Sequence, residues 1–172
     1  PYAGAADRAA LKPDEVGAYT ELMAASQQFV AEDILDAHDV TRHRRLMDIG
    51  GGDGSFLRAA ARRGASPQLT LFDLPSVVAL AGPRFAAQGL ADRVTLAGGD
   101  FTRDPLPSGH DLITLVRVAH DHDDAVVAAL LKSAHAALEP GGTLLIGEPM
   151  AGDARSAAFS DAYFGFYLLA MG

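Results

Sequence analysis

Cysteine is absent from this chain of 172 residues, and so is any long hydrophobic run. Without cysteine, disulfide bonds, thiolate metal sites and cysteine nucleophiles are excluded. No stretch approaches the roughly 18 consecutive apolar residues of a membrane-spanning helix, and residues 1–8 lack the basic-then-apolar pattern of a signal peptide. These absences predict a cytoplasmic protein.

Positive charge is also scarce, because 14 Lys and Arg residues stand against 22 Asp and Glu residues and give a formal net charge of −8. Domains that bind nucleic acids are more often basic, so we expect no nucleic-acid partner. The composition, 49% apolar and 21% charged, is that of a globular domain and not of a disordered chain. The sequence therefore predicts one domain with a small ligand that is cationic or apolar.

From residue 45 onward, short apolar runs alternate with segments of helical periodicity. The predicted strands are Arg45–Ile49, Gln68–Phe72, Arg93–Ala97, Leu112–Val118 and Thr143–Gly147. The predicted helices are Ser55–Arg63, Ser76–Gln88, which Pro83 should break, and Asp124–Leu138, which Gly141 should end. Repeated strand–helix units with strongly apolar strands are typical of an α/β fold whose parallel sheet is covered by helices on both faces.

The two ends of the chain show different patterns. Pro13–His38 predicts a long amphipathic helix, whose apolar stripe needs a partner, either the rest of the domain or a second subunit. The chain starts with Pro1 instead of Met and ends inside the aromatic and apolar segment Ala162–Gly172. We therefore expect the natural protein to continue at both ends.

The clearest functional signal follows the first strand, where a glycine-rich turn leads directly into a helix. Gly50, Gly52 and Gly54 let the backbone turn tightly and approach a ligand, whose polar atoms would face the N-terminus of the helix. No Gly-Lys-Ser/Thr follows, so the turn is not a phosphate-binding P-loop. Asp48 and Asp53 place carboxylates beside the turn, which favours a cationic ligand.

Acidic residues also follow the second and third strands. Asp73 stands 19 residues after Gly54, a position suited to binding a ribose diol, although it could instead cap the next helix. Asp100 can accept a hydrogen bond from an adenine amino group. Phe101 can stack on the adenine ring or simply fill the core, and the sequence leaves both interpretations open.

A run of histidine and aspartate, His120–Asp124, follows the fourth strand and should face the glycine turn, since ligands of open α/β sheets bind outside the carboxyl ends of the strands. One interpretation is a hydrolytic metal site formed by His120, His122 and Asp124. The usual hydrolase pattern has another histidine where Ala125 stands. The favoured interpretation makes His120 a general base, because the ordinary pKa of histidine lies close to neutral pH.

Four motifs carry a family resemblance: Asp-x-Gly-Gly-Gly-Asp-Gly at 48–54, Phe-Asp-Leu-Pro at 72–75, Gly-Asp-Phe at 99–101 and His-Asp at 120–121. From about Tyr19 to Gly172, the chain resembles the S-adenosylmethionine-dependent O-methyltransferases of the plant caffeic-acid and bacterial polyketide type. The resemblance implies a class I methyltransferase fold with strand order 3-2-1-4-5-7-6, from which the last strand pair is missing here. It also implies a catalytic domain over residues 45–172, preceded over residues 1–44 by a linking helix that remains from an N-terminal dimerisation domain.

The resemblance also assigns residues to a site. The implied binding residues for S-adenosylmethionine are Asp48, Gly50, Gly52, Asp73, Leu74, Asp100, Phe101 and Arg117. His120 matches the catalytic histidine of the family, and Glu148 matches a carboxylate that orients it. A second family glutamate lies past Gly172. Where the family commonly carries a lysine, this chain has Val116, followed by Arg117.

Two neighbours of His120, at 121 and 122, also carry expectations. Asp121 either contacts the substrate or caps the helix that begins at Asp124, and capping is favoured. His122 stands where the plant enzymes commonly have tryptophan, so we expect a residue of the site wall and not a second base.

Within the family, the strings Leu115–Asp124, Glu148–Gly152 and Asp161–Gly172 resemble the bacterial carotenoid branch, whose substrates are of the hydroxyneurosporene type. This implies a hydroxylated acyclic carotenoid as the acceptor. A phenolic or polyketide hydroxyl and a catalytically inactive cofactor-binding domain are the alternatives. The aromatic residues that either line an apolar site or pack on the core are Tyr163, Phe164, Phe166 and Tyr167. The resemblance further implies a homodimer for the full-length protein, with transient contact to a membrane surface that holds the substrate.

Overall fold

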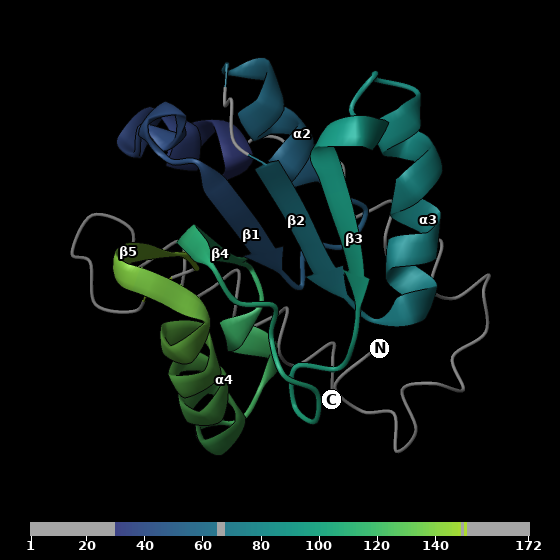
Figure 1. Ribbon diagram of the computed structural model, residues 1–172. Helices are drawn as coiled ribbons and strands as arrows, with labels where there is room; N and C mark the ends of the chain where they lie inside the picture. The colour runs from purple at the N-terminus through teal and green to yellow at the C-terminus, as the bar shows by residue number, and fades with distance from the viewer. Residues whose placement is uncertain (1–29, 65–67, 149, 151–172) are drawn as a thin grey trace, which may run out of the picture.

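The computed structural model describes residues 30–64, 68–148 and 150, and within them five parallel strands form one sheet in the order β3-β2-β1-β4-β5 (Figure 1). The strands are β1 (Arg45–Ile49), β2 (Gln68–Asp73), β3 (Val94–Gly98), β4 (His110–Val116) and β5 (Leu138–Gly147). The α-helices with defined bounds are α2 (Ser55–Arg62), α3 (Pro75–Ala86) and α4 (Asp124–Ala137). Short 3₁₀ turns lie at Val40–Arg42, Ala91–Arg93 and Ala119–Asp121. The predicted α/β fold with a parallel sheet is confirmed.

The central strand β1 shows how the two faces of the sheet are built. Leu46 packs in the apolar cluster that includes α2 and α3, whereas Met47 and Ile49 pack in the cluster that includes α4. Strand connections in parallel sheets are right-handed. Because the chain moves from β1 toward β3 in one direction and from β4 to β5 in the other, α2 and α3 lie on one face and α4 on the opposite face (Figure 1).

Burial decreases from the centre of the sheet to its edges. The strands β1, β2 and β4 are buried along most of their length, whereas β3 and β5 keep half-buried and exposed positions. Leu96 of β3 and Ile146 of β5 are 40% and 39% exposed. In the described part of the chain, the helices therefore cover the central strands more completely than the outer two.

The expected break of the third helix at Pro83 is wrong, because α3 continues through this residue to Ala86. A proline in a helix interior removes a hydrogen bond and costs about 3 kcal/mol. Two contacts of the last turn offset this cost. Phe85 is only 1% exposed in the core, and Arg84 forms an ion pair with Asp53.

Two boundaries near β4 and α4 also differ from prediction. The strand β4 ends at Val116 instead of Val118, because Arg117 adopts a left-handed backbone with φ of 58°. The helix α4 ends at Ala137, and Gly141 does not end it. Leu138 is already extended and pairs with His110 of β4, so β5 begins earlier than the apolar run suggested.

The described part of the predicted Pro13–His38 helix is helical over residues 30–37. Ala31 and Leu35 are buried in the cluster with α2 and α3, so the domain itself covers this part of the apolar stripe. The earlier part of that helix and the aromatic residues at 163–167 lie outside the described residues. No helix among the described residues is both long and apolar enough to cross a membrane.

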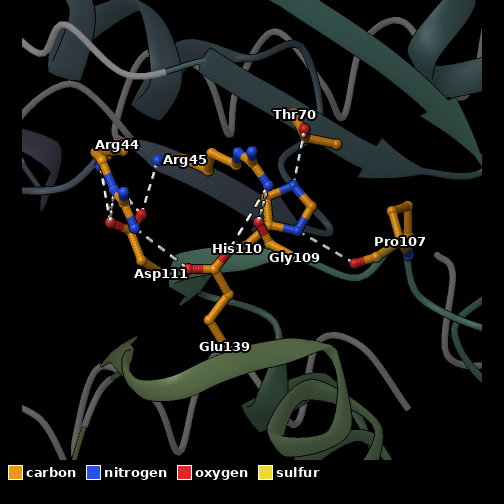
Figure 2. Close-up of polar contacts among 8 residues, drawn as sticks. All are labelled: Arg44, Arg45, Thr70, Pro107, Gly109, His110, Asp111 and Glu139. Carbon is orange, nitrogen blue, oxygen red and sulfur yellow. Dashed lines mark hydrogen bonds and ion pairs between the residues drawn. The ribbon is translucent and has the colours of Figure 1, made fainter.

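His110 joins two strands at the amino-terminal edge of the sheet, as Figure 2 shows. Its Nε2 lies 3.0 Å from Thr70 Oγ1 of β2, and its Nδ1 lies 3.2 Å from the carbonyl oxygen of Pro107. Because a carbonyl oxygen only accepts, we assign the proton to Nδ1, and Nε2 accepts from the Thr70 hydroxyl. Burial of the ring lowers the pKa of His110.

Beside His110, Asp111 ties the start of β1 to β4 (Figure 2). Its carboxylate accepts from the backbone N–H groups of Arg44 and Arg45 at 2.9 and 2.7 Å. Glu139 forms ion pairs of 3.5 Å with the side chains of the same two arginines. This edge is therefore occupied by groups that hold strands together, and it lies opposite the predicted site.

Candidate functional site

The predicted site residues lie at or shortly after the carboxyl ends of strands. The residues Gly50–Gly54 follow β1, Asp73 ends β2, Asp100 and Phe101 follow β3, His120 follows β4, and Glu148 follows β5. The connections from the adjacent strands β1 and β4 run in opposite directions. Open α/β sheets generally bind their ligands at the carboxyl edge beside such a switch point.

The glycine turn depends on backbone conformations that side chains rarely adopt. Gly50, Gly52 and Gly54 have φ values of 68°, 59° and 78°. A Cβ atom at Gly54 would lie 2.2 Å from Phe85 Cζ, so this glycine is required by packing. A Cβ atom at Gly52 would meet no atom within 4 Å. The turn is therefore packed on the core at Gly54 and open toward a ligand at Gly52.

Asp73 holds the open part of this turn. Its Oδ2 accepts from the Gly52 N–H at 2.8 Å, and its Oδ1 accepts from the Leu74 N–H at 2.7 Å. Burial raises the pKa of Asp73, although the hydrogen bonds from Gly52 and Leu74 act in the opposite direction. The N-cap residue of α3 is Leu74, so the alternative of Asp73 as the helix cap is wrong.

Asp48 and Asp53 occupy different environments. Asp48 is 1% exposed, and its Oδ1 accepts from Thr114 Oγ1 at 2.6 Å. The pKa of Asp48 is raised to about 7, chiefly by burial and also by the nearby Asp73 carboxylate, while the Thr114 hydrogen bond acts in the opposite direction. Asp53 pairs with Arg58 and Arg84, so the expectation that its carboxylate favours a cationic ligand is wrong.

The residues after β3 form a tight turn. Asp100 Oδ1 accepts from the N–H and the hydroxyl of Thr102 at 2.9 and 2.6 Å. Phe101 is half-buried against the cluster around α4, and its ring and that of His122 lie nearly perpendicular to each other at a centroid distance of 5.2 Å. His122 is therefore a direct neighbour of Phe101 at this edge.

Glu148 holds His120 and two backbone groups at once. Its Oε2 lies 2.7 Å from His120 Nδ1, and its Oε1 accepts from the N–H groups of Val118 and Ala119 at 2.6 and 2.7 Å. Burial raises the pKa of Glu148, but the hydrogen bonds from His120, Ala119 and Val118 lower it by more. Glu148 is therefore an ionised acceptor. Nδ1 of His120 therefore carries the donated proton.

Asp121 contacts His120 and does not cap α4. The N-cap residue of α4 is Asp123, whereas Asp121 Oδ1 lies 3.4 Å from His120 Nε2. The expectation of capping is therefore wrong, because the 3₁₀ turn Ala119–Asp121 directs this carboxylate toward the imidazole. Among the described residues, no group of three or more His, Asp or Glu side chains could hold a metal ion, so nothing there supports the metal-hydrolase alternative.

A family model described as an O-methyltransferase domain matches residues 4–172. The chain belongs to this family of O-methyltransferase domains. Demethylspheroidene O-methyltransferase of Rhodobacter capsulatus is 49% identical over 153 residues, which are 89% of this chain and 37% of that relative. The protein of the same name from Cereibacter sphaeroides is 46% identical over 94% of this chain and 43% of the relative. The chain thus spans less than half the length of either relative.

The crystal structure of human N-acetylserotonin methyltransferase in complex with S-adenosylmethionine has a TM-score of 0.70 and 27% identity to this chain. The match covers 82% of this chain and 41% of the human chain. The predicted class I methyltransferase fold of this O-methyltransferase domain is thereby confirmed.

The carboxyl edge of the sheet fits such a cofactor. Gly52 opens into free space, and the Asp73 carboxylate lies beside it at the end of the second strand, where a ribose diol is recognised in related folds. Asp48 Oδ2, below the turn, accepts no hydrogen bond from any described residue.

Sequence reasoning missed two contributors to the site. Thr114 donates to Asp48. Its polar side chain inside an otherwise apolar strand is the feature of the sequence that could have indicated this role. The N–H groups of Val118 and Ala119 bind Glu148. Nearly every residue has a backbone N–H group, so the amino-acid sequence could not indicate these two contacts.

Proposed function

We propose that this domain methylates a hydroxyl group of an apolar acceptor, with S-adenosylmethionine as the methyl donor and His120 as the general base. The observation that carries the proposal is the pairing of His120 with the ionised Glu148 at 2.7 Å, at the edge that also holds the glycine turn. The cofactor supplies an electrophilic methyl group on a sulfonium. Since a neutral alcohol is a weak nucleophile, the task of the protein is to remove its proton.

In this proposal, Nε2 of His120 takes the hydroxyl proton while the acceptor oxygen attacks. Glu148 keeps the ring in the tautomer with the proton on Nδ1, as the carboxylate does in hydrolytic triads. After the transfer, the Nε2–H group faces Asp121 Oδ1 at 3.4 Å. Two carboxylates then flank the imidazolium. A positioned base of this kind contributes about 10²–10⁴ in rate.

The cofactor would be held by groups from four neighbouring strand ends, those of β3, β2, β1 and β4. The proposed binding residues are Asp48, Gly50, Gly52, Asp73, Leu74, Asp100, Phe101 and Arg117. Asp73 is assigned to the ribose hydroxyls, with Leu74 fixing its carboxylate, and Asp100 with Phe101 to the adenine. Asp100 Oδ1 is used within its own turn, and Oδ2 lies 3.9 Å from Nε of the exposed Arg103 side chain.

As the acceptor we propose the tertiary hydroxyl of a hydroxylated acyclic carotenoid. Support comes from the relatives at 49% and 46% identity, both named for demethylspheroidene. A tertiary aliphatic alcohol is far less acidic than a phenol, so His120 would remove the proton within the transition state, and alignment of the reactants would supply much of the acceleration. We place such an enzyme in the cytoplasm, in transient contact with the membrane surface that holds its substrate.

The test is a methyl-transfer assay of the full-length protein with labelled S-adenosylmethionine, offered either a 1-hydroxylated carotenoid or a small phenol. We expect label in the carotenoid. The variant His120→Ala should lose about 10²-fold or more in turnover and keep its affinity for S-adenosylhomocysteine. His135→Ala removes an exposed histidine of α4 and serves as the matched control.

Each alternative outcome points to a different function. Label in the phenol alone would move the protein to the phenolic or polyketide branch. Binding of S-adenosylhomocysteine without any transfer would indicate an inactive cofactor-binding domain. Turnover of His120→Ala equal to that of the natural protein would remove His120 from the mechanism.

We also propose that residues 1–44 link the catalytic domain, residues 45–172, to a dimerisation domain, and that the full-length protein is a homodimer. The support is the family membership and the amphipathic pattern of Pro13–His38. Light scattering of the full-length protein tests it, and a monomer at micromolar concentration would refute it.

A further inference from the structure

A strained residue lies between β4 and His120. Arg117 has a φ of 58°, and among the described residues it is the one residue other than glycine with a positive φ. In this region the Cβ atom of an L-residue crowds the backbone, so the conformation persists only where surrounding contacts stabilise it.

Three consecutive N–H groups in this turn find acceptors on β5 and just beyond it. The N–H of Arg117 donates to the carbonyl oxygen of Gly147 at 2.9 Å. The N–H groups of Val118 and Ala119 both donate to Glu148 Oε1, at 2.6 and 2.7 Å. The left-handed Arg117 is followed by Val118 in a right-handed conformation, with φ of −119° and ψ of −47°. Successive N–H groups in such a turn form a concave anion-binding nest.

The same turn contacts the glycine turn after β1. Val118 is 7% exposed, and a Cβ atom placed on Gly50 would lie 2.8 Å from Val118 Cγ2. The Val118 side chain therefore packs directly on the Gly50 backbone. The turn thus has Glu148 on one side and the proposed cofactor loop on the other.

We propose that Arg117 is a positioning residue that acts through its left-handed backbone. The nest that it opens grips Oε1 of Glu148, which leaves Oε2 for His120 Nδ1 and places this pair beside the glycine turn. The inference rests on the proposed function and deepens it. A correctly oriented His120 would require the left-handed backbone at residue 117 and not the guanidinium charge of its side chain.

The test compares substitutions that all remove the guanidinium but differ in their preference for left-handed backbone. Glycine adopts it freely, asparagine tolerates it, alanine less so, and β-branched valine resists it most. We expect kcat to follow that order, with Arg117→Gly about tenfold or more above Arg117→Val. The KM values and the affinity for S-adenosylhomocysteine should differ much less among these variants. Gly64→Val imposes the same strain at a φ of 86° with open surroundings, and it should leave kcat unchanged.

A second readout does not depend on activity. The ¹⁵N chemical shifts of the His120 ring report which nitrogen carries the proton. We expect protonated Nδ1 in the natural protein and in Arg117→Gly, and a mixture of tautomers in Arg117→Val. Should Arg117→Val fail to fold, the comparison of Arg117→Gly with Arg117→Ala applies the same test.

Two results would overturn the inference. Equal tautomers and equal kcat across the series would show that the nest does not position His120. Rescue by Arg117→Lys alone, with Arg117→Gly as impaired as Arg117→Val, would assign the role to the positive charge. If no methyl transfer is found at all, the proposed function fails, while the ¹⁵N shifts still decide whether the nest sets the tautomer.

Discussion

The carboxylate of Asp73 accepts hydrogen bonds from the N–H groups of Gly52 and Leu74, at 2.8 and 2.7 Å, and keeps further lone pairs for a ligand. These bonds orient the carboxylate before any ligand arrives. A preoriented charged acceptor binds a hydroxyl more strongly than a neutral one does.

We predict that Asp73→Ala weakens the binding of S-adenosylhomocysteine by about 1.5–3 kcal/mol, the range for a hydrogen bond to a charged group. Titration calorimetry measures the change. Asp92→Ala removes an exposed aspartate of a 3₁₀ turn and serves as the control. An affinity of Asp73→Ala equal to that of Asp92→Ala would contradict the ribose assignment.

Asp48 presents a second prediction for a single residue, because burial raises its pKa to about 7. Between its ordinary pKa of 3.8 and about 7, the folded protein holds a proton that the unfolded chain has lost. The contribution of Asp48 to stability therefore decreases as the pH rises through this window, by up to about 1.4 kcal/mol per pH unit, and is constant above it.

The variant Asp48→Asn should lack this decrease. We therefore expect the free energy of unfolding of the variant, minus that of the natural protein, to be larger above pH 7 than near pH 4. Urea unfolding at a series of pH values measures the difference. Parallel pH dependences for the two proteins would show that Asp48 ionises normally in the folded state.

At the scale of elements, the glycine turn between β1 and α2 combines packing with binding. Gly54→Ala and Gly64→Ala both place a side chain at positive φ, 78° and 86°, but only the first meets an atom, Phe85 Cζ at 2.2 Å. We predict that Gly54→Ala destabilises the domain by about 1–3 kcal/mol more than Gly64→Ala, since overpacking adds to the shared backbone strain. Chemical unfolding midpoints test this, and equal midpoints would contradict the packing role.

At the scale of the whole molecule, the two edges of the sheet carry residues with different roles. The carboxyl edge carries the candidate site, whereas the amino edge carries the contacts of His110, Asp111 and Glu139 with neighbouring strands (Figure 2). Burial lowers the pKa of His110 from its ordinary value of 6.5. Its contribution to stability is therefore fully present above pH 6.5 and is lost as the pH falls through the lowered pKa.

We predict that the natural protein loses stability below pH 6.5 relative to His110→Gln, because only the natural unfolded chain gains a proton at this position. His135→Gln, on the exposed side of α4, is the control. Because Asp48 acts with the opposite sign in part of the same pH range, the two effects are separable only in single variants. If the stability difference between the natural protein and His110→Gln does not change with pH, His110 titrates normally.

The sequence alone determined the alternation of strands and helices, the glycine turn and the carboxyl-edge position of Asp73, His120 and Glu148. These features depend on local patterns, since the period of apolar residues sets the type of each element and the direction of parallel strands brings their ends to one edge. The family motifs suggested the proposed cofactor and reaction, because they lie within short continuous segments.

Only the tertiary structure decided which polar group meets which. Asp53 turned from a possible ligand group to a partner of Arg58 and Arg84, and the last turn of α3 stayed helical beyond Pro83. The Val118 N–H and the carboxylate of Glu148 are separated by 30 residues, so no local pattern could report their contact. The left-handed φ of Arg117 belongs to the same turn, and no local pattern could report it either, because the hydrogen-bond partners of this turn lie on β5 and just beyond it.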